Sequence, residues 1–198
     1  MTKATKRTRA LTGTAMLAAV ATILMYMEFP IPIMPGFIKM DISELPALIA
    51  SFAYGPLSGI AVCLIKNLIK LPSTSTAAVG ELFNFVMGAL FVGMAGIVYK
   101  KNKTRKGAII GAVAGALIMA LVSLPYNYFV VYPAYVVMYH LPLEAIIGMY
   151  QAINPNVSGL LACLVTFNVP FTFAKGMVDA LLCFLIYKPL SPILHGRK

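Results

Sequence analysis

Long apolar runs, separated by short polar or proline-rich breaks, dominate the pattern along the chain. The first run covers about residues 10–29 after a basic N-terminal stretch, and Pro30, Pro32 and Pro35 follow it. A helix of about 20 apolar residues is long enough to cross the hydrocarbon core of a bilayer. The first run therefore predicts a membrane-spanning helix that ends at the proline-rich segment.

The second apolar run is too long for one ordinary span. It extends over about residues 43–71 and is interrupted by Gly55 and Pro56 within the sequence GPLSG. A Gly-Pro step is typical of a turn. We therefore expect two short helices with a tight reversal between them.

Three more spans are expected after the polar loop PSTSTAAVG. Their apolar runs cover about residues 81–99, 107–125 and 159–185. The last run contains Pro170 near its middle. The aromatic and proline-broken segment over residues 126–158 predicts an ordered cap with a short helix at about 143–152. The complete pattern predicts six transmembrane helices.

Composition supports an all-α integral membrane protein. Of the 198 residues, 60% are hydrophobic and 11% are charged, and the mean hydropathy is +0.87. A soluble domain is typically about half apolar. Six spans of about 20 residues each leave little chain for a separate soluble domain, so we expect a single membrane domain over residues 1–198.

Charge is distributed unevenly between the two sides of the six expected spans. Both termini, the GPLSG turn and the run KKNKTRK fall on one side. That side holds twelve of the sixteen Lys and Arg residues, four near the N-terminus, five in KKNKTRK and three near the C-terminus, and no acidic residue. By the positive-inside rule it is cytoplasmic, whereas five spans would divide the basic clusters between two faces. We expect both termini in the cytoplasm, with membrane lipid rather than nucleic acid as the partner of the basic clusters.

Residue types that carry catalysis or bind metals are sparse. Cys63, Cys163 and Cys183 lie singly in apolar runs, which favours buried free thiols over a metal site or disulfides. His140 and His195 are the only histidines, and neither H-E-x-x-H nor G-x-S-x-G occurs. We expect no enzyme, no metal and no cofactor. The sequence lacks a Walker A motif, so ATP-driven transport would require other subunits.

The remaining polar residues gather at the non-cytoplasmic ends of the expected spans. Glu81 and Asn84 are three residues apart and share a helix face. Asn168, Thr172 and Lys175 share another face in the last span, where an ionisable residue is by default a functional candidate. We expect an outward-facing ligand pocket with largely apolar walls. Aromatic residues that could supply the walls are Tyr26, Phe29, Phe37, Phe83, Phe85, Tyr126, Tyr128, Phe171 and Phe173.

Structural roles compete with these assignments. Asp41 could cap the next helix, and Glu81 could simply begin its helix favourably. Lys66 is better explained as a side chain that snorkels to the membrane interface. Asp179 lies four residues after Lys175 on the same face and would be a structural ion-pair partner for it.

Several motifs occur in order along residues 10–194: K-M-D-I-S-E-L-P-A-L-I, F-A-Y-G-P-L-S-G, I-K-N-L-I-K, S-T-S-T, V-G-E-L-F-N-F, the N-Y and Y-P pairs at 127–133, P-F-T-F-A-K-G and Y-K-P-L-S-P. Together they resemble the riboflavin-specific S components of energy-coupling factor (ECF) transporters, the RibU family. The resemblance implies a six-helix subunit of the bacterial cell membrane that captures riboflavin at the extracellular side for ATP-driven uptake. It also implies a membrane scaffold subunit and two cytoplasmic ATPases as partners.

The motifs and the polar pattern together define the expected riboflavin site. Its residues are Lys39, Met40, Asp41, Asn67, Glu81, Asn84, Asn127, Tyr132, Asn168, Thr172 and Lys175. Thr172 stands where the family commonly has Asn in P-F-N-x-x-K, and a hydroxyl lacks the reach of an amide. The alternative ligand is therefore another vitamin, such as a pyridoxine or thiamine precursor. A self-sufficient secondary transporter is a further alternative, although the expected internal repeats are missing.

The first predicted span carries small residues at four-residue spacing. They occur as Ala15-x-x-x-Ala19 and Ala18-x-x-x-Thr22, a spacing that permits close helix approach in lipid. In the family an alanine motif of this kind contacts the scaffold subunit, which implies that role for Ala15 and Ala19. Internal packing is the alternative.

Overall fold

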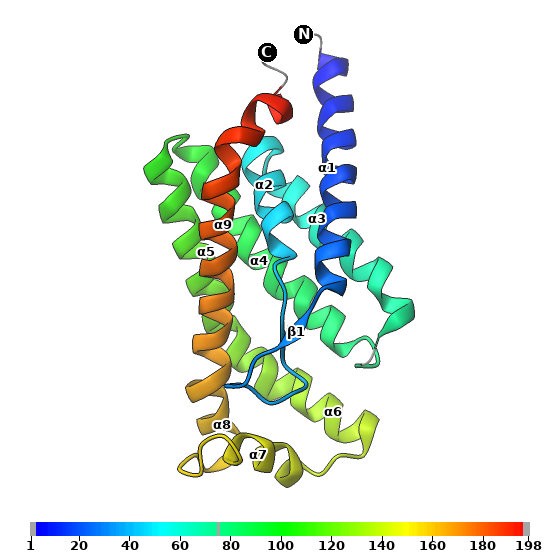
Figure 1. Ribbon diagram of the computed structural model, residues 1–198, viewed down its shortest axis with the longest axis vertical. Coiled ribbons are helices and arrows are strands. Elements are labelled where there is room, and N and C mark those ends of the chain that lie inside the picture. Colours follow the sequence, from blue (N-terminus) through cyan, green and yellow to red (C-terminus); the bar gives the residue numbers. More distant parts are fainter. Residues whose placement is uncertain (1–2, 75, 196–198) are drawn as a thin grey trace.

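The protein is a mostly helical bundle with one short hairpin, described here from a computed structural model that covers residues 3–74 and 76–195 (Figure 1). The helices are α1 (Lys3–Tyr26), α2 (Glu44–Tyr54), α3 (Pro56–Lys70), α4 (Val79–Lys101), α5 (Arg105–Tyr126), α6 (Tyr132–Tyr139), α7 (Leu143–Gln151), α8 (Gly159–Cys163) and α9 (Val169–His195). The short elements are β1 (Phe29–Pro30), β2 (Lys39–Met40), the 3-10 turn η1 (Leu71–Ser73) and the π-helical turns η2 (Asn127–Val131) and η3 (Leu164–Asn168).

Four helical segments among the described residues are long and apolar enough to cross a membrane. They are Ala4–Tyr26, Val79–Lys101, Arg105–Met138 and Gly159–Tyr187. The predicted helical membrane protein is thereby confirmed. Helices α2 and α3 have 11 and 15 residues, fewer than the roughly 20 that an ordinary span requires. Six transmembrane helices therefore stay a prediction.

The second apolar run divides at GPLSG as predicted. Gly55 has a φ of 110°, which is strained for any residue with a Cβ. Pro56 begins α3, where its missing N–H costs no helical hydrogen bond. A Cβ on Gly59 would lie 2.7 Å from the Cβ of Ser51 and 2.8 Å from the carbonyl oxygen of Ala47. Helices α2 and α3 therefore lie side by side in close contact.

The fifth predicted span is longer than expected because the helix continues through proline. The fifth span was expected to end near Pro125, but α5, η2 and α6 form one helical segment, Arg105–Met138. The π-helical turn directly after Pro125 adjusts the backbone locally, which is how membrane helices satisfy groups freed by proline. Pro170 likewise follows the π-helical turn η3 within the last span.

The run KKNKTRK is mostly helical, which corrects the expected loop. Only residues 102–104 connect α4 to α5. Thr104 caps α5 because its side chain accepts a hydrogen bond from the Gly107 backbone N–H. The basic residues of this run stay exposed at the helix ends.

Glycines allow α4 and α5 to approach closely. A Cβ on Gly115 would lie 2.4 Å from the carbonyl oxygen of Phe91, and one on Gly111 would lie 2.7 Å from that of Ala95. Backbone contact of this kind is typical of helix packing in lipid. The three cysteines are buried free thiols, which confirms the prediction for them.

An unpredicted hairpin orders the proline-rich segment between α1 and α2. Phe29 pairs with Met40, and Pro30 pairs with Lys39, in an antiparallel register. Proline is compatible with such a short edge pairing, where no continuous ladder needs its N–H. The hairpin lies beside the lower half of the bundle (Figure 1) and brings the KMDISELP stretch to the ends of the helices.

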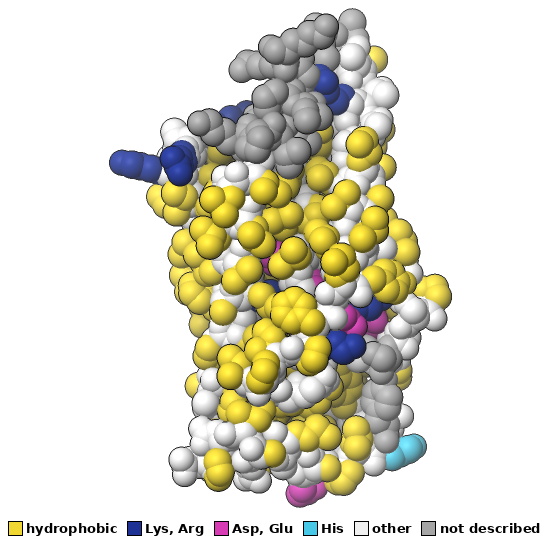
Figure 2. All heavy atoms as spheres, in the orientation of Figure 1, with side chains coloured by type: hydrophobic (Ala, Val, Ile, Leu, Met, Phe, Trp, Pro, Cys, Tyr) yellow, Lys and Arg dark blue, Asp and Glu magenta, His cyan; other side chains and the backbone are white. Residues whose placement is uncertain are grey.

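The surface and the chain ends agree with a membrane setting. Hydrophobic side chains cover most of the middle of the face shown in Figure 2, and basic side chains appear towards its upper end. The two chain ends lie at that same end of the molecule, which is opposite α6 and α7 (Figure 1).

Candidate functional site

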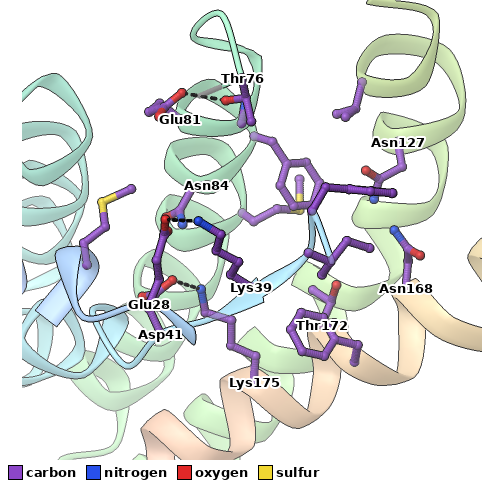
Figure 3. Close-up of a pocket in the computed structure, with 18 of the residues that line it drawn as sticks. Glu28, Lys39, Asp41, Thr76, Glu81, Asn84, Asn127, Asn168, Thr172 and Lys175 are labelled. Atoms are coloured by element: carbon purple, nitrogen blue, oxygen red, sulfur yellow. Dashed lines mark hydrogen bonds and ion pairs between the residues drawn. The ribbon is translucent and has the colours of Figure 1, made fainter. Parts of the chain in front are cut away.

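A cavity of about 180 Å³ lies between the loop of residues 27–43 and the ends of the long helices. A cavity needs about 10–15 Å³ by this measure to hold one water molecule, so this one has room for a small organic molecule. Nine of the eleven predicted site residues line it: Lys39, Asp41, Glu81, Asn84, Asn127, Tyr132, Asn168, Thr172 and Lys175. Figure 3 shows them arriving from separate parts of the chain. The predicted convergence of the polar residues is therefore observed.

Two predicted site residues are buried beside the cavity without lining it. Met40 belongs to β2 and pairs with Phe29 of β1. Asn67 donates a hydrogen bond from its amide nitrogen to the Cys63 carbonyl oxygen one turn earlier, at 2.8 Å. Met40 therefore belongs to the hairpin, and Asn67 bonds to its own helix. The structure does not bring either side chain to the cavity.

Lys175 is held by two acidic residues from the segment before and at the start of α2. Its Nζ lies 2.8 Å from Asp41 Oδ2 (Figure 3). It also lies 3.3 Å from Glu44 Oε2. The expected ion pair with Asp179 does not form among the described residues. The reason is that the loop of residues 27–43 brings Asp41 closer to Lys175 than the neighbour on its own helix.

Lys66 is fully buried, which overturns the expectation that it snorkels to the interface. Its Nζ lies 2.6 Å from Glu44 Oε1 and also donates to the Ser43 hydroxyl oxygen. Glu44 thus joins two lysines, Lys66 on α3 and Lys175 on α9. This network ties three helices together next to the cavity.

Asp41 does not cap α2, although the sequence allowed it. Its Oδ1 accepts from the Ser43 backbone N–H at 2.9 Å and from the Ser43 hydroxyl at 2.5 Å, while no side chain caps the first turn of α2. Burial alone would raise the pKa of the Asp41 carboxyl, but the ammonium groups of Lys175 and Lys66 outweigh it and hold the pKa below its ordinary value. Asp41 is therefore ionised at neutral pH and pairs with Lys175 there.

A second ion-pair group closes the cavity on the α1 side. Glu28 lies 2.8 Å from Lys39 Nζ and 2.5 Å from Lys70 Nζ. Burial would raise the pKa of Glu28, but hydrogen bonds from Lys39 and Lys70 lower it below its ordinary value. Glu28 was missed as a site residue because it ends an apolar run that was read only as a span. An acid at the end of such a run was the available signal.

Glu81 holds the loop between α3 and α4 in place. Its Oε2 accepts from the Thr74 hydroxyl at 2.7 Å. It also accepts from the Thr76 hydroxyl at 2.9 Å (Figure 3). It also lies in the first turn of α4, as the structural alternative expected. Glu81 lines the cavity together with Thr76, so it combines a cavity position with a loop contact.

The opposite wall is built from aromatic rings and amides. Tyr150 donates from its hydroxyl to Asn168 Oδ1 at 2.7 Å, and Tyr132 shares hydrogen bonds with both of them. Phe37 packs edge-on against Tyr132 and Tyr150, with ring centroids 6.4 and 6.3 Å apart. Of the nine aromatic residues expected in the walls, Phe37, Phe83 and Phe171 line the cavity.

The lining of this cavity is suited to the recognition of a small molecule. Among the described residues, no group of three or more His, Cys, Asp or Glu is placed to hold a metal ion. Apolar and aromatic walls with a few convergent polar groups are typical of a pocket that binds a small molecule. The arrangement can bind a flat, polar-edged ligand.

Comparison with known proteins identifies the family of the chain. The model of the family described as "ECF transporter, substrate-specific component" matches residues 9–187. The riboflavin transporter RibU of Staphylococcus aureus (strain TCH60) is 32% identical over 180 residues, which are 91% of this chain and 89% of that protein. The riboflavin transporter FmnP of Bacillus subtilis (strain 168) is 33% identical over 187 residues, or 93% of each chain.

A solved structure shares the fold as well. It is described as "Structure and mechanism of the S component of a bacterial ECF transporter" and aligns with a TM-score of 0.73 and 31% identity over 95% of this chain and 98% of that chain. The relatives are named as transporters, in agreement with the expectation that the chain is not an enzyme. The chain therefore belongs to the family of substrate-specific S components of ECF transporters.

Proposed function

We propose that this S component binds riboflavin and delivers it for uptake. The observation that carries the proposal is the cavity in which nine predicted site residues meet, in a chain whose relatives along nine-tenths of its length are named riboflavin transporters. The same relatives favour riboflavin over a pyridoxine or thiamine precursor.

The lining of the cavity suits the two parts of riboflavin. The isoalloxazine ring system needs apolar or aromatic faces, which Phe37, Phe83 and Phe171 offer. The ribityl hydroxyls both donate and accept hydrogen bonds, and side chains such as Asn127 and Asn168 can pair with them in either direction. Thr172 also lines the cavity and can serve as one donor and one acceptor in place of the amide common in the family.

The cavity is proposed to face the outside of the cell. Its lining residues come from the end of α3, the start of α4, the turn after α5 and the start of α9. The exposed basic run at the α4–α5 connection lies at the other ends of these helices. The positive-inside rule places that basic end in the cytoplasm, so the protein would cross the bacterial cell membrane six times with both termini inside.

ATP-driven uptake is proposed to depend on a scaffold subunit and two ATPase subunits. The sequence has no Walker A motif with which to bind ATP itself. Ala15 and Ala19 are exposed on α1, whereas Ala18 is 1% exposed and packs into the bundle. The two small-residue motifs of α1 therefore lie on different faces of the helix. Ala18 and Thr22 are buried in the bundle, whereas Ala15 and Ala19 are exposed and could contact a partner helix.

Riboflavin binding is tested by titration of the purified protein in detergent. Flavin fluorescence should be quenched with a stoichiometry of about one riboflavin per chain. Lys175→Ala and Asp41→Ala should each weaken binding by about ten-fold or more, because each substitution removes a charge-assisted pair at the cavity. Glu144→Ala is the matched control, since Glu144 is exposed on α7 away from the cavity.

Pyridoxine and thiamine are titrated in competition in the same assay. If adding the protein changes neither the flavin fluorescence nor the heat of mixing, riboflavin does not bind. That result would exclude riboflavin as the ligand and leave the membership of the family unchanged. Equal binding by the Lys175→Ala variant would place the ligand elsewhere in the molecule.

A further inference from the structure

Asp179 is an acidic residue of the cavity whose carboxyl oxygens accept no hydrogen bond from the part of the chain that the structure describes. Its side chain is fully buried, and it lines the cavity. Neither carboxyl oxygen has a hydrogen-bond partner among the described residues. A buried polar group left unpaired costs free energy, so this position is an exception that requires an explanation.

The cations near Asp179 are already engaged by other acids. Lys175 binds Asp41 and Glu44, and Lys66 binds Glu44 and the Ser43 hydroxyl. The cavity thus contains cations with partners and an acid without one. A ligand that entered this part of the cavity would meet an unused hydrogen-bond acceptor.

Lys175 also keeps one N–H for a ligand. An ammonium group has three donors, and two acceptors, Asp41 Oδ2 and Glu44 Oε2, lie near its Nζ. Lys175 and Asp179 are four residues apart on α9 and therefore share one helix face. Their side chains present a donor and an acceptor one turn apart along the same wall.

The walls at this depth are suited to a flat ring. Met87 and Met119 line the cavity and are each 3% exposed. A Cβ on Gly176 would lie 2.8 Å from the Met119 Cε atom, so Met119 packs directly against the turn of α9 between Lys175 and Asp179. Thioether side chains pack favourably against aromatic rings.

We propose that Asp179 is a specificity-determining residue that accepts a hydrogen bond from the imide N–H of the bound flavin ring, while Lys175 donates to the adjacent ring carbonyl. This inference rests on the proposed function and adds to it which edge of the ligand the protein recognises. An imide edge offers a carbonyl next to an N–H, which matches the donor and acceptor of these two side chains. The ribityl chain would then extend towards the amides of Asn127 and Asn168.

The test combines a change in the protein with a change in the ligand. Riboflavin and 3-methylriboflavin, in which a methyl group replaces the imide hydrogen, are titrated against the wild type and Asp179→Ala. Wild type should bind riboflavin about ten- to a hundred-fold more tightly than the methylated ligand, as expected when a hydrogen bond is lost and its buried partner is left unpaired. Asp179→Ala should bind riboflavin more weakly by a similar factor and bind the two ligands within about two-fold of each other.

Two further variants keep the test decisive. Asp179→Asn retains an acceptor oxygen, so its affinity for riboflavin should lie between those of wild type and Asp179→Ala. It also replaces Asp179→Ala if that variant does not purify as a folded protein. Glu144→Ala should leave the discrimination between the two ligands unchanged.

The outcomes separate this inference from the proposed function. Equal binding of both ligands by wild type, or full discrimination by Asp179→Ala, would overturn the role of Asp179 while riboflavin binding itself stands. If wild type binds no riboflavin at all, both the proposed function and this inference are overturned.

Discussion

Buried charges at the residue scale hold the cavity in shape. Lys66 is fully buried, and its Nζ lies 2.6 Å from Glu44 Oε1. The other oxygen of the same carboxylate, Glu44 Oε2, contacts Lys175. Removing one partner of a buried ion pair leaves the other charge uncompensated, at a cost of about 3–5 kcal/mol. Lys66→Met should therefore lower the free energy of unfolding by that amount, measured by thermal unfolding of the purified protein in detergent.

The matched control for Lys66 is a lysine whose ion pair is exposed. Lys39 pairs with Glu28, and its side chain is 39% exposed. Exposed pairs contribute about 0–1 kcal/mol, so Lys39→Met should change stability little. The double variant with Lys66→Met and Glu44→Gln should recover part of the loss, because the carboxylate that Lys66 neutralises is then also replaced by an uncharged amide. A neutral effect of Lys66→Met would contradict the structural role of this pair.

At the scale of the element, the two faces of α1 differ in their exposure. Ala18 and Ala21 point into the bundle, whereas Ala15 and Ala19 are exposed. Small residues let two helix backbones approach closely, and a larger side chain keeps them apart. Replacing both exposed alanines by Leu should therefore abolish co-purification with the scaffold and ATPase subunits, while the riboflavin affinity of the isolated S component stays within about two-fold.

Ala145→Leu is the control for the α1 substitution. Ala145 is exposed on α7, at the opposite end of the molecule from the chain ends. Assembly should survive this change. Intact assembly of the Ala15→Leu, Ala19→Leu variant would show that the partner binds another face of the bundle.

The proposed orientation of the whole molecule can be tested at its two ends. The chain ends lie at one end of the bundle, and α6 and α7 lie at the other (Figure 1). All three native cysteines are buried, so an introduced surface cysteine would react first. In intact cells, a maleimide that cannot cross membranes should label Glu144→Cys on α7, and should label Lys103→Cys only after the cells are opened. The reverse labelling pattern would place the cavity on the cytoplasmic side.

Most of the helical plan was predictable because it depends on local sequence. Apolar length located the long helices, and Gly55 with Pro56 located the division between α2 and α3. Two helix ends were wrong, near Pro125 and in KKNKTRK, because proline and lysine are read as helix breakers or loop residues in isolation. Packing and a π-helical turn decided otherwise.

The candidate site was predictable in its membership but only partly in its contacts. Polar residues are so costly within an apolar chain that those away from the basic ends stand out as candidates, and nine of them line one cavity. The ion-pair partners of these residues were harder to predict from the sequence. Asp179 seemed the natural partner of Lys175 at four-residue spacing, yet Lys175 pairs with Asp41, which is 134 residues away.

The sequence by itself determined that the chain is a helical membrane protein and where its long helices run. It also determined which polar residues are candidates for a functional site. The reason is that hydropathy and charge act over distances of one helix or less. Only the tertiary structure decided which acid neutralises which lysine, that Lys66 is buried, that Ala15 and Ala19 face outward and that Asp179 has no partner among the described residues. These outcomes depend on how the loop of residues 27–43 and the helices meet in space. Contacts between distant segments leave no periodic signal in either segment.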